Sequence, residues 1–373
     1  MNAHEAYVAL NMMEGIGPVS VKALVEALGS PEAIWQADRS TLMKAPGIGP
    51  GLADKILSQR NQIDPGNEIR RAAEMGAALI TPADPGYPPA LAQIHDPPLA
   101  LYVRGEFQPK DRHALAIVGT RHPSHYGKET AARLSAQLAR SGWTVVSGLA
   151  RGIDTAAHSA ALTASGRTIA VLGGGLAHIY PPENRPLAER IAAGHGAVIT
   201  EFPLDRAPDR TTFPMRNRII SGLARGVLVV EASRQSGALI TANQALEQGR
   251  SVMAVPGRID APGARGTHAL IKNGARLVED LEDILAEFEF LLPQCPQPGA
   301  SKPDEPVGTP VNLTDEELRI MAVLQDEEQD FDVLIRQTGI SAARLNVVLL
   351  TMEMKRLVKV LPGRLVAATR SHA

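Results

Sequence analysis

Short apolar runs alternate with segments of helical periodicity through the middle of the chain. The apolar runs are residues 114–118, 144–146, 168–172, 197–200, 227–230 and 251–255, and the helical segments are residues 127–140, 155–164, 183–193, 217–223 and 238–248. Most positions in each run are apolar, so both faces of each strand should be buried, which is typical of a parallel sheet covered by helices. The pattern predicts an α/β fold, with a Rossmann-like doubly wound, mainly parallel sheet as its core.

Two similar units make up residues 1–79. Gly15-Ile16-Gly17 precedes an amphipathic stretch over residues 19–28, and Gly47-Ile48-Gly49 precedes another over residues 52–59. This is the pattern of a tandem helix-hairpin-helix (SAM-like) module, whose glycine turns present backbone amides to a nucleic-acid phosphate. Few lysines or arginines lie near either turn, so a helical bundle whose hairpins only pack is an equally good interpretation.

The segments on either side of the sheet pattern predict the remaining organisation. Residues 81–109 are rich in proline, which indicates a connector with one short edge strand at residues 99–103. We expect domains at residues 1–79, 80–290 and 312–373, with a flexible linker at 291–311 that is rich in proline, glycine and serine.

The last domain has the pattern of a winged helix. Helices are expected at residues 318–324, 331–338 and 342–356, followed by a strand-turn-strand over residues 358–366. The candidate recognition helix, 342–356, carries mainly apolar side chains, with bases at Arg344, Lys355 and Arg356. A helix that reads a duplex should be more polar and basic, so we favour a protein contact over a DNA contact for this domain.

Composition restricts the choice of partners and compartment. The 373 residues carry a formal net charge of −2, so an anion site must be a local patch. The single cysteine, Cys295, excludes an intramolecular disulfide framework and a cysteine-based zinc site. The N-terminus lacks a signal-peptide pattern, and no apolar run approaches the roughly 20 residues that span a bilayer. We therefore expect a cytoplasmic protein without a membrane span.

Small residues follow every predicted strand. Gly119-Thr120-Arg121 follows the first, Ser147 to Asp154 the second, Gly173 to Gly175 the third, and Ser236-Gly237 comes after the fifth. Small residues allow a ligand to approach the backbone, and the helix N-termini that follow add partial positive charge, so this sheet edge suits phosphate. Neither a dinucleotide G-x-G-x-x-G pattern at the first turn nor a Walker lysine motif is present, so NAD and ATP hydrolysis are weakly supported and no cofactor is expected.

Arginines are concentrated at the same edge. Phe213-Pro214-Met215-Arg216-Asn217-Arg218 places two of them around an asparagine, and others precede or follow this stretch or come from other strand exits. The others are Arg121, Arg151, Arg206, Arg210 and Arg225. These arginines either bind an anion or pair with Glu201, Glu231 and Asp154 to brace the loops. Anion binding is the better interpretation, because many arginines come together from separate loops. Asn217 is expected to cap a helix that begins at Arg218.

Catalytic groups do not stand out. His158 lies four residues after Asp154 on one predicted helix, where a local packing role is the better interpretation. We find no Ser-His-Asp set, metal cluster or carboxylate pair and expect no enzyme activity.

Several long motifs in fixed order resemble the DprA/Smf family of bacterial DNA-processing proteins. They are Ala116 to Arg121 with Tyr126-Gly127, Ser147 to Asp154 with Ala157-His158, Tyr180 to Asn184, Phe213 to Gly222, Ser236 to Thr241, and Val255-Pro256-Gly257 with Gly266-Thr267 and Leu270-Ile271. The resemblance runs continuously from about residue 84 to residue 278, and the two terminal domains fit the same architecture.

The resemblance implies a protein that binds single-stranded DNA cooperatively, protects incoming DNA and loads a RecA-type recombinase onto it in natural transformation and homologous recombination. It also implies a homodimer formed through the Rossmann domain. Carried over by motif, the DNA contacts are Gly119, Thr120, Arg121, Ser147, Gly148, Arg151, Arg210, Phe213, Arg216, Asn217, Arg218, Ser236 and Gly237. Arg210 stands where relatives often have a lysine, and Pro182 stands where some have a basic residue.

An alternative is a Rossmann-type nucleotide-processing enzyme similar to the cytokinin-activating phosphoribohydrolases. Their Pro-Gly-Gly-x-Gly-Thr signature is interrupted here, because Pro256-Gly257 and Gly266-Thr267 are separated by an insertion. The interruption argues against the enzyme, for which Glu231 would be the candidate carboxylate. A scaffold that only binds other proteins is the third possibility.

Overall fold

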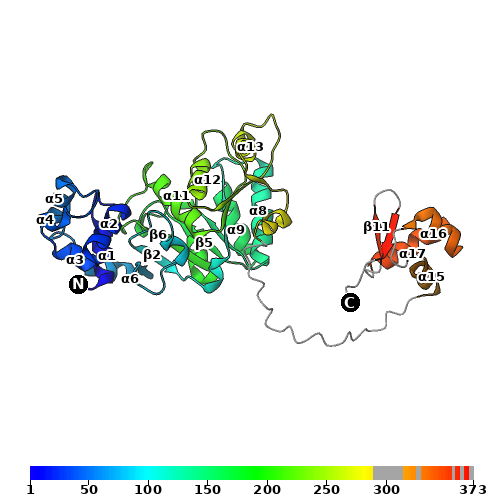
Figure 1. Cartoon of the computed structure of the whole chain (residues 1–373), viewed down its shortest axis with the longest axis horizontal. Coiled ribbons are helices and arrows are strands. Elements are labelled where there is room, and N and C mark those ends of the chain that lie inside the picture. Colours follow the sequence, from blue (N-terminus) through cyan, green and yellow to red (C-terminus); the bar gives the residue numbers. More distant parts are fainter. Residues whose placement is uncertain (289–313, 325–328, 355–357, 362–364, 369–373) are drawn as a thin grey trace. The chain divides into compact units, whose positions relative to one another are not determined.

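The computed structural model describes residues 1–288, 314–324, 329–354, 358–361 and 365–368. The chain divides into two compact units, Met1–Pro293 and Gln294–Ala373, which we describe separately. Figure 1 shows the helices and strands of both. Cys295 and the expected linker at 291–311 lie outside the described residues. Within the described part of the chain, no helix combines the length and apolar composition needed to cross a membrane.

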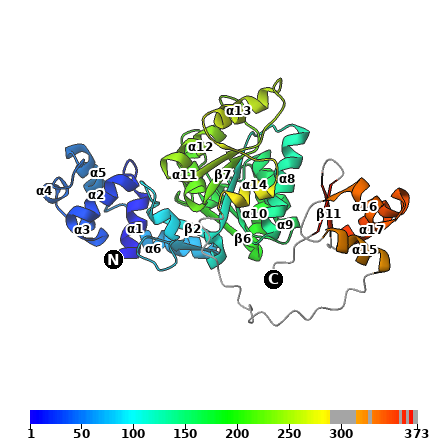
Figure 2. The ribbon, with the colours of Figure 1, turned by 45° about the vertical axis from the view of Figure 1, so that its right-hand side comes forward.

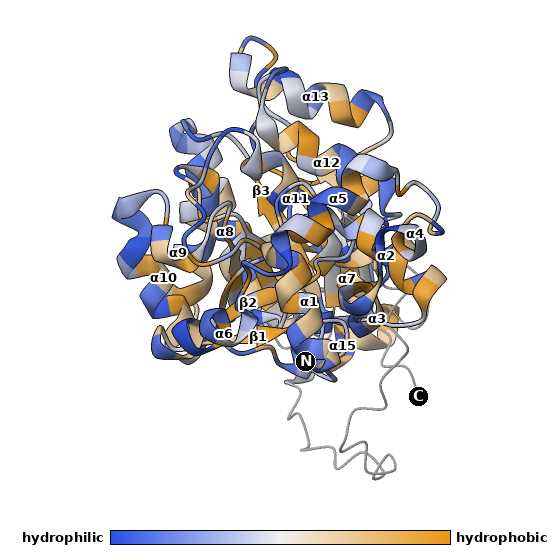
Figure 3. Cartoon of the chain, turned by 90° about the vertical axis from the view of Figure 1, so that its left-hand side faces the viewer, coloured by the Kyte–Doolittle hydropathy of each residue, from blue (hydrophilic) through white to orange (hydrophobic). Residues whose placement is uncertain are grey.

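The first unit begins with six helices. They are α1 (Ala3–Met12), α2 (Pro18–Leu28), α3 (Pro31–Gln36), α4 (Arg39–Leu42), α5 (Pro50–Gln59) and α6 (Pro65–Glu74). Gly15 and Gly47 have φ of 75° and 79°, which glycine adopts without strain, and a proline opens each following helix. In Figure 3, α2, α3 and α5 each carry hydrophilic and hydrophobic residues, and the buried ones form one core. The predicted tandem helix-hairpin-helix module is confirmed.

A nine-stranded sheet follows, with the strand order β1-β2-β6-β5-β4-β3-β7-β8-β9. The strands are β1 (Ala77–Ile80), β2 (Leu101–Gly105), β3 (Ala114–Val118), β4 (Thr144–Ser147), β5 (Thr168–Val171), β6 (Gly196–Thr200), β7 (Gly226–Val229), β8 (Ser251–Ala254) and β9 (Arg276–Leu277). The pairs β1–β2 and β2–β6 are antiparallel and the rest parallel, which confirms the mainly parallel core. Each of the six predicted core strands is present, with its ends displaced by one residue at most.

Helices cover both faces of this sheet. One face packs against α8 (His125–Arg140), α9 (Ile153–Thr163) and α14 (Leu281–Ala286), and the other against α7 (Pro89–Ala92), α11 (Thr212–Leu223) and α12 (Gly237–Glu247). Figure 2 shows α11 and α12 on the opposite side of the strands from α8 and α9. Strand β3 is buried on both sides, because Ala114, Ala116 and Val118 belong to one core while Leu115 and Ile117 belong to the other.

The remaining segments of the first unit are short. They are α10 (Arg185–Arg190) and α13 (Arg265–Lys272), 3-10 turns at Pro109–Arg112, Leu176–His178, Pro182–Asn184 and Pro262–Ala264, and a π-helical turn at Ile191–His195.

The order of the strands reverses between β3 and β7. From β3 the chain adds β4, β5 and β6 on one side, and then returns to add β7, β8 and β9 on the other. In such sheets the loops at the carboxyl ends of the two central strands diverge and leave a crevice for a ligand. This switch point positions the site described below.

The second unit is a small winged helix, as predicted. It contains α15 (Asp315–Leu324), β10 (Gln329–Asp330), α16 (Phe331–Thr338), α17 (Ala342–Met354), β11 (Val358–Leu361) and β12 (Leu365–Ala368), with the antiparallel sheet order β10-β12-β11. Leu345, Val348, Leu349 and Met352 of α17 are buried in the core of this unit. Their apolar character is therefore explained by packing within the domain, so it is no longer a reason to favour a protein contact over a DNA contact.

Candidate nucleic-acid interface

A cavity of about 430 Å³ lies at the switch point of the sheet. Its walls come from the loop after β3, from α11 and from the N-terminal half of α12. It brings together most of the predicted contact residues, namely Gly119, Thr120, Arg121, Arg210, Phe213, Arg216, Asn217, Ser236 and Gly237. The backbone N–H of Thr120 donates to the carbonyl of Glu231 at 2.7 Å and thereby ties the two central loops together.

Helix α11 begins at Thr212, earlier than Arg218, where the pattern predicted its start. Asp209 is the reason, because its Oδ1 accepts from the backbone N–H groups of Thr211 (2.7 Å) and Thr212 (3.0 Å) and so holds the start of the helix. Asn217 therefore lies in the middle of the helix, and the prediction that it caps a helix was wrong. Phe213, Arg216, Asn217 and Ile220 share the face that lines the cavity, as a helical period requires.

The ring of Phe213 lies beside two arginines and a tyrosine. The guanidinium carbon of Arg121 lies 5.0 Å from its ring centroid and that of Arg216 lies 5.9 Å away, while the Tyr180 ring centroid is at 6.0 Å. The backbone of Gly173 packs so closely against the ring that a Cβ there would meet it at 2.6 Å. Arg121 is exposed and has no carboxylate partner among the described residues. The group thus combines an aromatic surface with an unneutralised guanidinium.

Arg216 is a buried cation that faces the cavity. Its side chain donates to the carbonyl of Gly148 at 2.6 Å and to that of Val171, and the residue is 4% exposed. Burial lowers the pKa of Arg216 to about 10, Asp154 opposes this shift, and the nearby charge of Arg121 lowers the pKa further. Arg216 stays charged at neutral pH. A negatively charged ligand between Arg121 and Arg216 would relieve the repulsion between them.

The loop after β4 is held beneath Arg216 by Asp154. The Asp154 carboxylate accepts from the backbone N–H groups of Gly148 (3.1 Å) and Ala150 (3.3 Å). Burial raises the pKa of Asp154, against the opposing charge of Arg216. Three arginines, Arg121, Arg210 and Arg216, line the cavity against this one carboxylate, so it is a positive patch in a chain whose net charge is −2.

Gly148 leaves the space that the Arg216 guanidinium occupies. A Cβ at this position would lie 2.7 Å from both the guanidinium carbon and Nη2 of Arg216. We expect Gly148→Ala to displace Arg216 from the two carbonyls and to lower the free energy of unfolding by about 1–3 kcal/mol. Urea unfolding measures the loss, and Gly237→Ala is the matched control, because a Cβ there meets nothing within 4 Å. Equal stability of the two variants would contradict this account of Gly148.

Three of the predicted contact residues, Ser147, Gly148 and Arg151, lie outside this cavity. Ser147 is fully buried, and its hydroxyl donates to the carbonyl of Ile117 at 2.6 Å, so the side chain joins β4 to β3. Arg151 lies in a small adjoining cleft, which Arg121, Gly148, Phe213 and Arg216 also line. Its Nε donates to Glu183 at 2.5 Å, and its side chain is 47% exposed.

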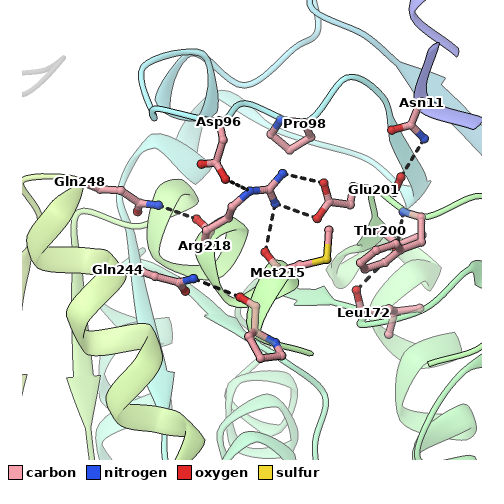
Figure 4. Close-up of polar contacts among 12 residues, drawn as sticks. Asn11, Asp96, Pro98, Leu172, Thr200, Glu201, Met215, Arg218, Gln244 and Gln248 are labelled. Atoms are coloured by element: carbon pink, nitrogen blue, oxygen red, sulfur yellow. Dashed lines mark hydrogen bonds and ion pairs between the residues drawn. The ribbon is translucent and has the colours of Figure 1, made fainter. Parts of the chain in front are cut away.

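Arg218 also lies outside the cavity and occupies the opposite side of α11. Its guanidinium is bound by Glu201, at 2.7 and 2.6 Å, and by Asp96 at 2.7 Å (Figure 4). The side chain is 7% exposed. The bracing interpretation therefore holds for Arg218, and we withdraw it from the DNA contacts. Glu231, which that interpretation also paired with an arginine, accepts instead from the backbone N–H (3.0 Å) and hydroxyl (2.9 Å) of Ser124.

Sequence reasoning missed several residues of the cavity wall. His122 follows the predicted Arg121, while Ser233, Ile240 and Thr241 come from the loop before α12 and from α12 itself. Ile240 and Thr241 lie three and four residues after Gly237, so they share its helix face, and the helical period could have found them. Ser236 caps α12, with its Oγ accepting from the N–H of Ala238 at 3.3 Å, and the N-terminus of this helix lines the cavity.

The fold and the cavity define a class: α/β proteins with a doubly wound sheet that offer an arginine-lined site for a phosphate-bearing ligand at the carboxyl edge. The model of the DNA recombination-mediator protein A family matches residues 78–289, more than half of the chain. The chain belongs to this family, the DprA/Smf proteins. The DprA winged helix domain matches residues 303–364, and the SAM-like helix-hairpin-helix tandem matches residues 8–61.

Individual relatives agree with this assignment. Protein Smf of Synechocystis sp. is 36% identical, with 97% of this chain and 98% of that protein covered, and Protein Smf of Escherichia coli is 44% identical over 78% of each. The X-ray structure of DNA processing protein A from Streptococcus pneumoniae has a TM-score of 0.68 and 35% identity, covering 78% of this chain and 99% of that one. DNA processing protein A from Helicobacter pylori, whose structure is described as giving insights into its single-stranded DNA binding mode, has a TM-score of 0.51 and 29% identity, covering 56% and 95%.

Proposed function

We propose that the protein binds single-stranded DNA in the cavity at the switch point, protects it and loads a RecA-type recombinase onto it in natural transformation and homologous recombination. The observation that carries the DNA-binding part is that Arg121, Arg210 and Arg216 line one cavity with Phe213, and that Arg121 and Arg216 lie beside its ring. Family membership supports the recombinase partner, a homodimer through the Rossmann domain and a cytoplasmic location. In this proposal the protein has no enzyme activity and uses no cofactor.

The cavity has the two components that sequence-independent strand binding needs. Arginine guanidinium groups neutralise phosphates, and aromatic or guanidinium planes stack against bases of any kind. Arg121 lies over Phe213 and is exposed, so its guanidinium can donate to a phosphate. A Cβ at Gly237 would meet no protein atom within 4 Å, so the glycine leaves open space there for the strand to approach the backbone, whereas Gly119 makes room for Ile153 and the Glu231 carbonyl.

The proposal is tested by comparing labelled single-stranded and double-stranded oligonucleotides at two salt concentrations. We expect tight binding to single strands of mixed sequence, weaker binding to the duplex, and a fall in affinity with salt whose slope is about −0.7 for each phosphate contacted. The recombinase is then added to the protein–DNA complex, and faster filament formation is expected. Equal affinity for both forms of DNA, or affinity independent of salt, would contradict the proposal.

A second cavity favours the alternative function, a nucleotide-processing enzyme. It has a volume of about 570 Å³ and lies beside Glu231, with mainly apolar walls from Tyr126, Val230, Val255, Pro256 and Ala261. A phosphoribohydrolase-like enzyme would release a free base from a nucleoside monophosphate by hydrolysis. Incubation with nucleoside monophosphates decides: turnover that Glu231→Ala abolishes would favour the enzyme, and its absence alongside tight strand binding would favour the DNA-binding proposal.

A further inference from the structure

The loop from β6 to α11, residues 201–211, carries Arg210, which lines the cavity. The N-terminal helices hold this loop at successive points. Nδ2 of Asn11 on α1 donates to the carbonyl of Glu201 at 2.8 Å. Oε1 of Glu68 on α6 accepts from the backbone N–H of Leu204 at 2.9 Å, and the carboxylate is 5% exposed.

The same loop is held from the other side by α11. Glu201 binds both terminal nitrogens of the Arg218 guanidinium, with side chains that are 8% and 7% exposed. Arg218 Nη1 also donates to the carbonyl of Met215 at 3.1 Å (Figure 4). Burial opposes the charge of Arg218, but Glu201 and Asp96 outweigh it and raise the pKa of Arg218. Glu201 thus contacts α1 through its backbone and α11 through its carboxylate.

The rotation of α11 about its own axis determines which of its side chains face the cavity. Phe213 and Arg216 line the cavity from one side of the helix, while Arg218 is anchored on the other. Gln244 of α12 and Gln248, which follows the end of that helix, donate to the carbonyls of Pro214 (3.1 Å) and Arg218 (3.0 Å). These two bonds hold α11 from the other side of the helix pair, and the Glu201–Arg218 pair connects α11 to the loop that α1 and α6 contact.

We propose that the N-terminal helical module sets the affinity of the cavity for single-stranded DNA by positioning the 201–211 loop and α11, and that Arg218 is the positioning residue which transmits this effect. The module then acts through the Rossmann domain without touching a phosphate itself. The inference rests on the proposed function, because it concerns the residues that would hold the strand.

The test uses the full chain and two variants. Asn11→Leu removes the hydrogen bond from α1, and Arg218→Lys keeps the charge but loses the two-nitrogen contact with Glu201. Affinity for a fluorescent oligothymidylate is measured by anisotropy, and hydrogen–deuterium exchange is measured over residues 201–216. We expect both variants to weaken binding, Arg218→Lys by about tenfold, which corresponds to one misaligned charged hydrogen bond, and both to speed exchange in this segment.

Matched controls separate positioning from general loss of stability. Arg167→Lys disrupts the Arg167–Asp111 pair, whose side chains are 6% and 8% exposed and which lies at the amino end of β5, away from the cavity. Ser30→Ala removes a hydrogen bond to Ala33 within the N-terminal module. Neither control should change the affinity or the exchange of residues 201–216.

Each outcome decides between the two proposals. Wild-type affinity in both Asn11→Leu and Arg218→Lys, while Arg121→Ala binds weakly, would overturn the positioning role and leave the DNA site intact. Wild-type affinity in Arg121→Ala would overturn the proposed DNA site. In that case, unchanged hydrogen–deuterium exchange over residues 201–216 in Asn11→Leu and Arg218→Lys would overturn the positioning role as well. If Arg218→Lys fails to fold, Asn11→Leu decides alone, because it changes a partly buried amide outside the ion pair.

Discussion

Replacing Arg121 with alanine should weaken binding to single-stranded DNA of every sequence by about tenfold to a hundredfold, the usual effect of losing a charged hydrogen bond. Arg121 is exposed, lies 5.0 Å from the Phe213 centroid and has no carboxylate partner among the described residues. Its removal should cost the complex one phosphate contact, so the slope of log affinity against log salt should become shallower by about 0.7. Fluorescence anisotropy at several salt concentrations measures both effects.

Arg140→Ala is the matched control for this experiment. Arg140 is exposed at the C-terminal end of α8, and the chain continues from there to the amino end of β4, on the side of the sheet away from the cavity. Both variants change the net charge equally, so a general electrostatic effect would weaken both. A loss of affinity confined to one base composition would also contradict the proposal, because a phosphate contact carries no sequence information.

The strands of the core could be predicted because they are buried on both faces. A run such as residues 227–230 is apolar throughout, and the structure has β7 at Gly226–Val229. The edges of the sheet could not be predicted in this way. The edge strand expected at residues 99–103 is present as β2 (Leu101–Gly105), but it pairs with both β1 and β6, so its expected place at the edge was wrong. β9 has only two residues, Arg276–Leu277, and Leu277 is 41% exposed. β1 follows directly after α6 and crosses the expected domain boundary between residues 79 and 80, since it pairs with β2.

The start of α11 was misplaced for a local reason. Asn217 was expected to cap a helix beginning at Arg218, whereas the helix already includes Pro214 in its first turn, where the missing N–H of proline costs nothing. The side chain of Asp209 binds the backbone at the start of the helix. Only the geometry of the loop shows that its carboxylate reaches the backbone N–H groups of Thr211 and Thr212.

The error at α11 also explains why Arg216 and Arg218 were placed in one site. Residues two apart on an α-helix are separated by about 200° around its axis, so both cannot face one cavity. Once the helix is known to begin at Thr212, the sequence assigns the two arginines to opposite sides. Which side faces the ligand follows from the partners, because Arg216 bonds to Gly148 and Val171 at the carboxyl edge, while Arg218 bonds to Glu201 and Asp96.

An alanine substitution should therefore have different effects at the two buried arginines of α11. Arg216 faces the cavity and, within the described part of the chain, has only Asp154 as a nearby opposite charge, so its loss affects both the ligand and the fold. Arg218 is already neutralised by two carboxylates and does not line the cavity. The contribution of Arg218 should appear first in the stability of the first unit and in the setting of α11.

We expect Glu201→Ala to lower the free energy of unfolding by about 3 kcal/mol, the low end of the range for breaking a buried ion pair. The variant leaves the Arg218 guanidinium buried, and Asp96, whose side chain is 34% exposed, remains as its partner. The double variant Glu201→Leu/Arg218→Met should recover most of this loss, because apolar side chains of similar size fill the same space without a desolvation penalty. Urea unfolding followed through the buried Trp143 measures the three proteins.

The double variant separates stability from positioning. Suppose that the pair serves mainly to set the rotation of α11. The double variant should then unfold at nearly the same urea concentration as the wild type and still bind single-stranded DNA less tightly. The reason is that a methionine cannot fix the direction of Phe213 and Arg216 as a two-nitrogen ion pair does. Asp111→Ala, which breaks the comparable Arg167–Asp111 pair, should lose stability and keep its affinity when measured on folded protein. If the double variant is as unstable as Glu201→Ala, the pair contributes net stability. If the double variant binds single-stranded DNA as tightly as the wild type, packing alone sets the rotation of α11.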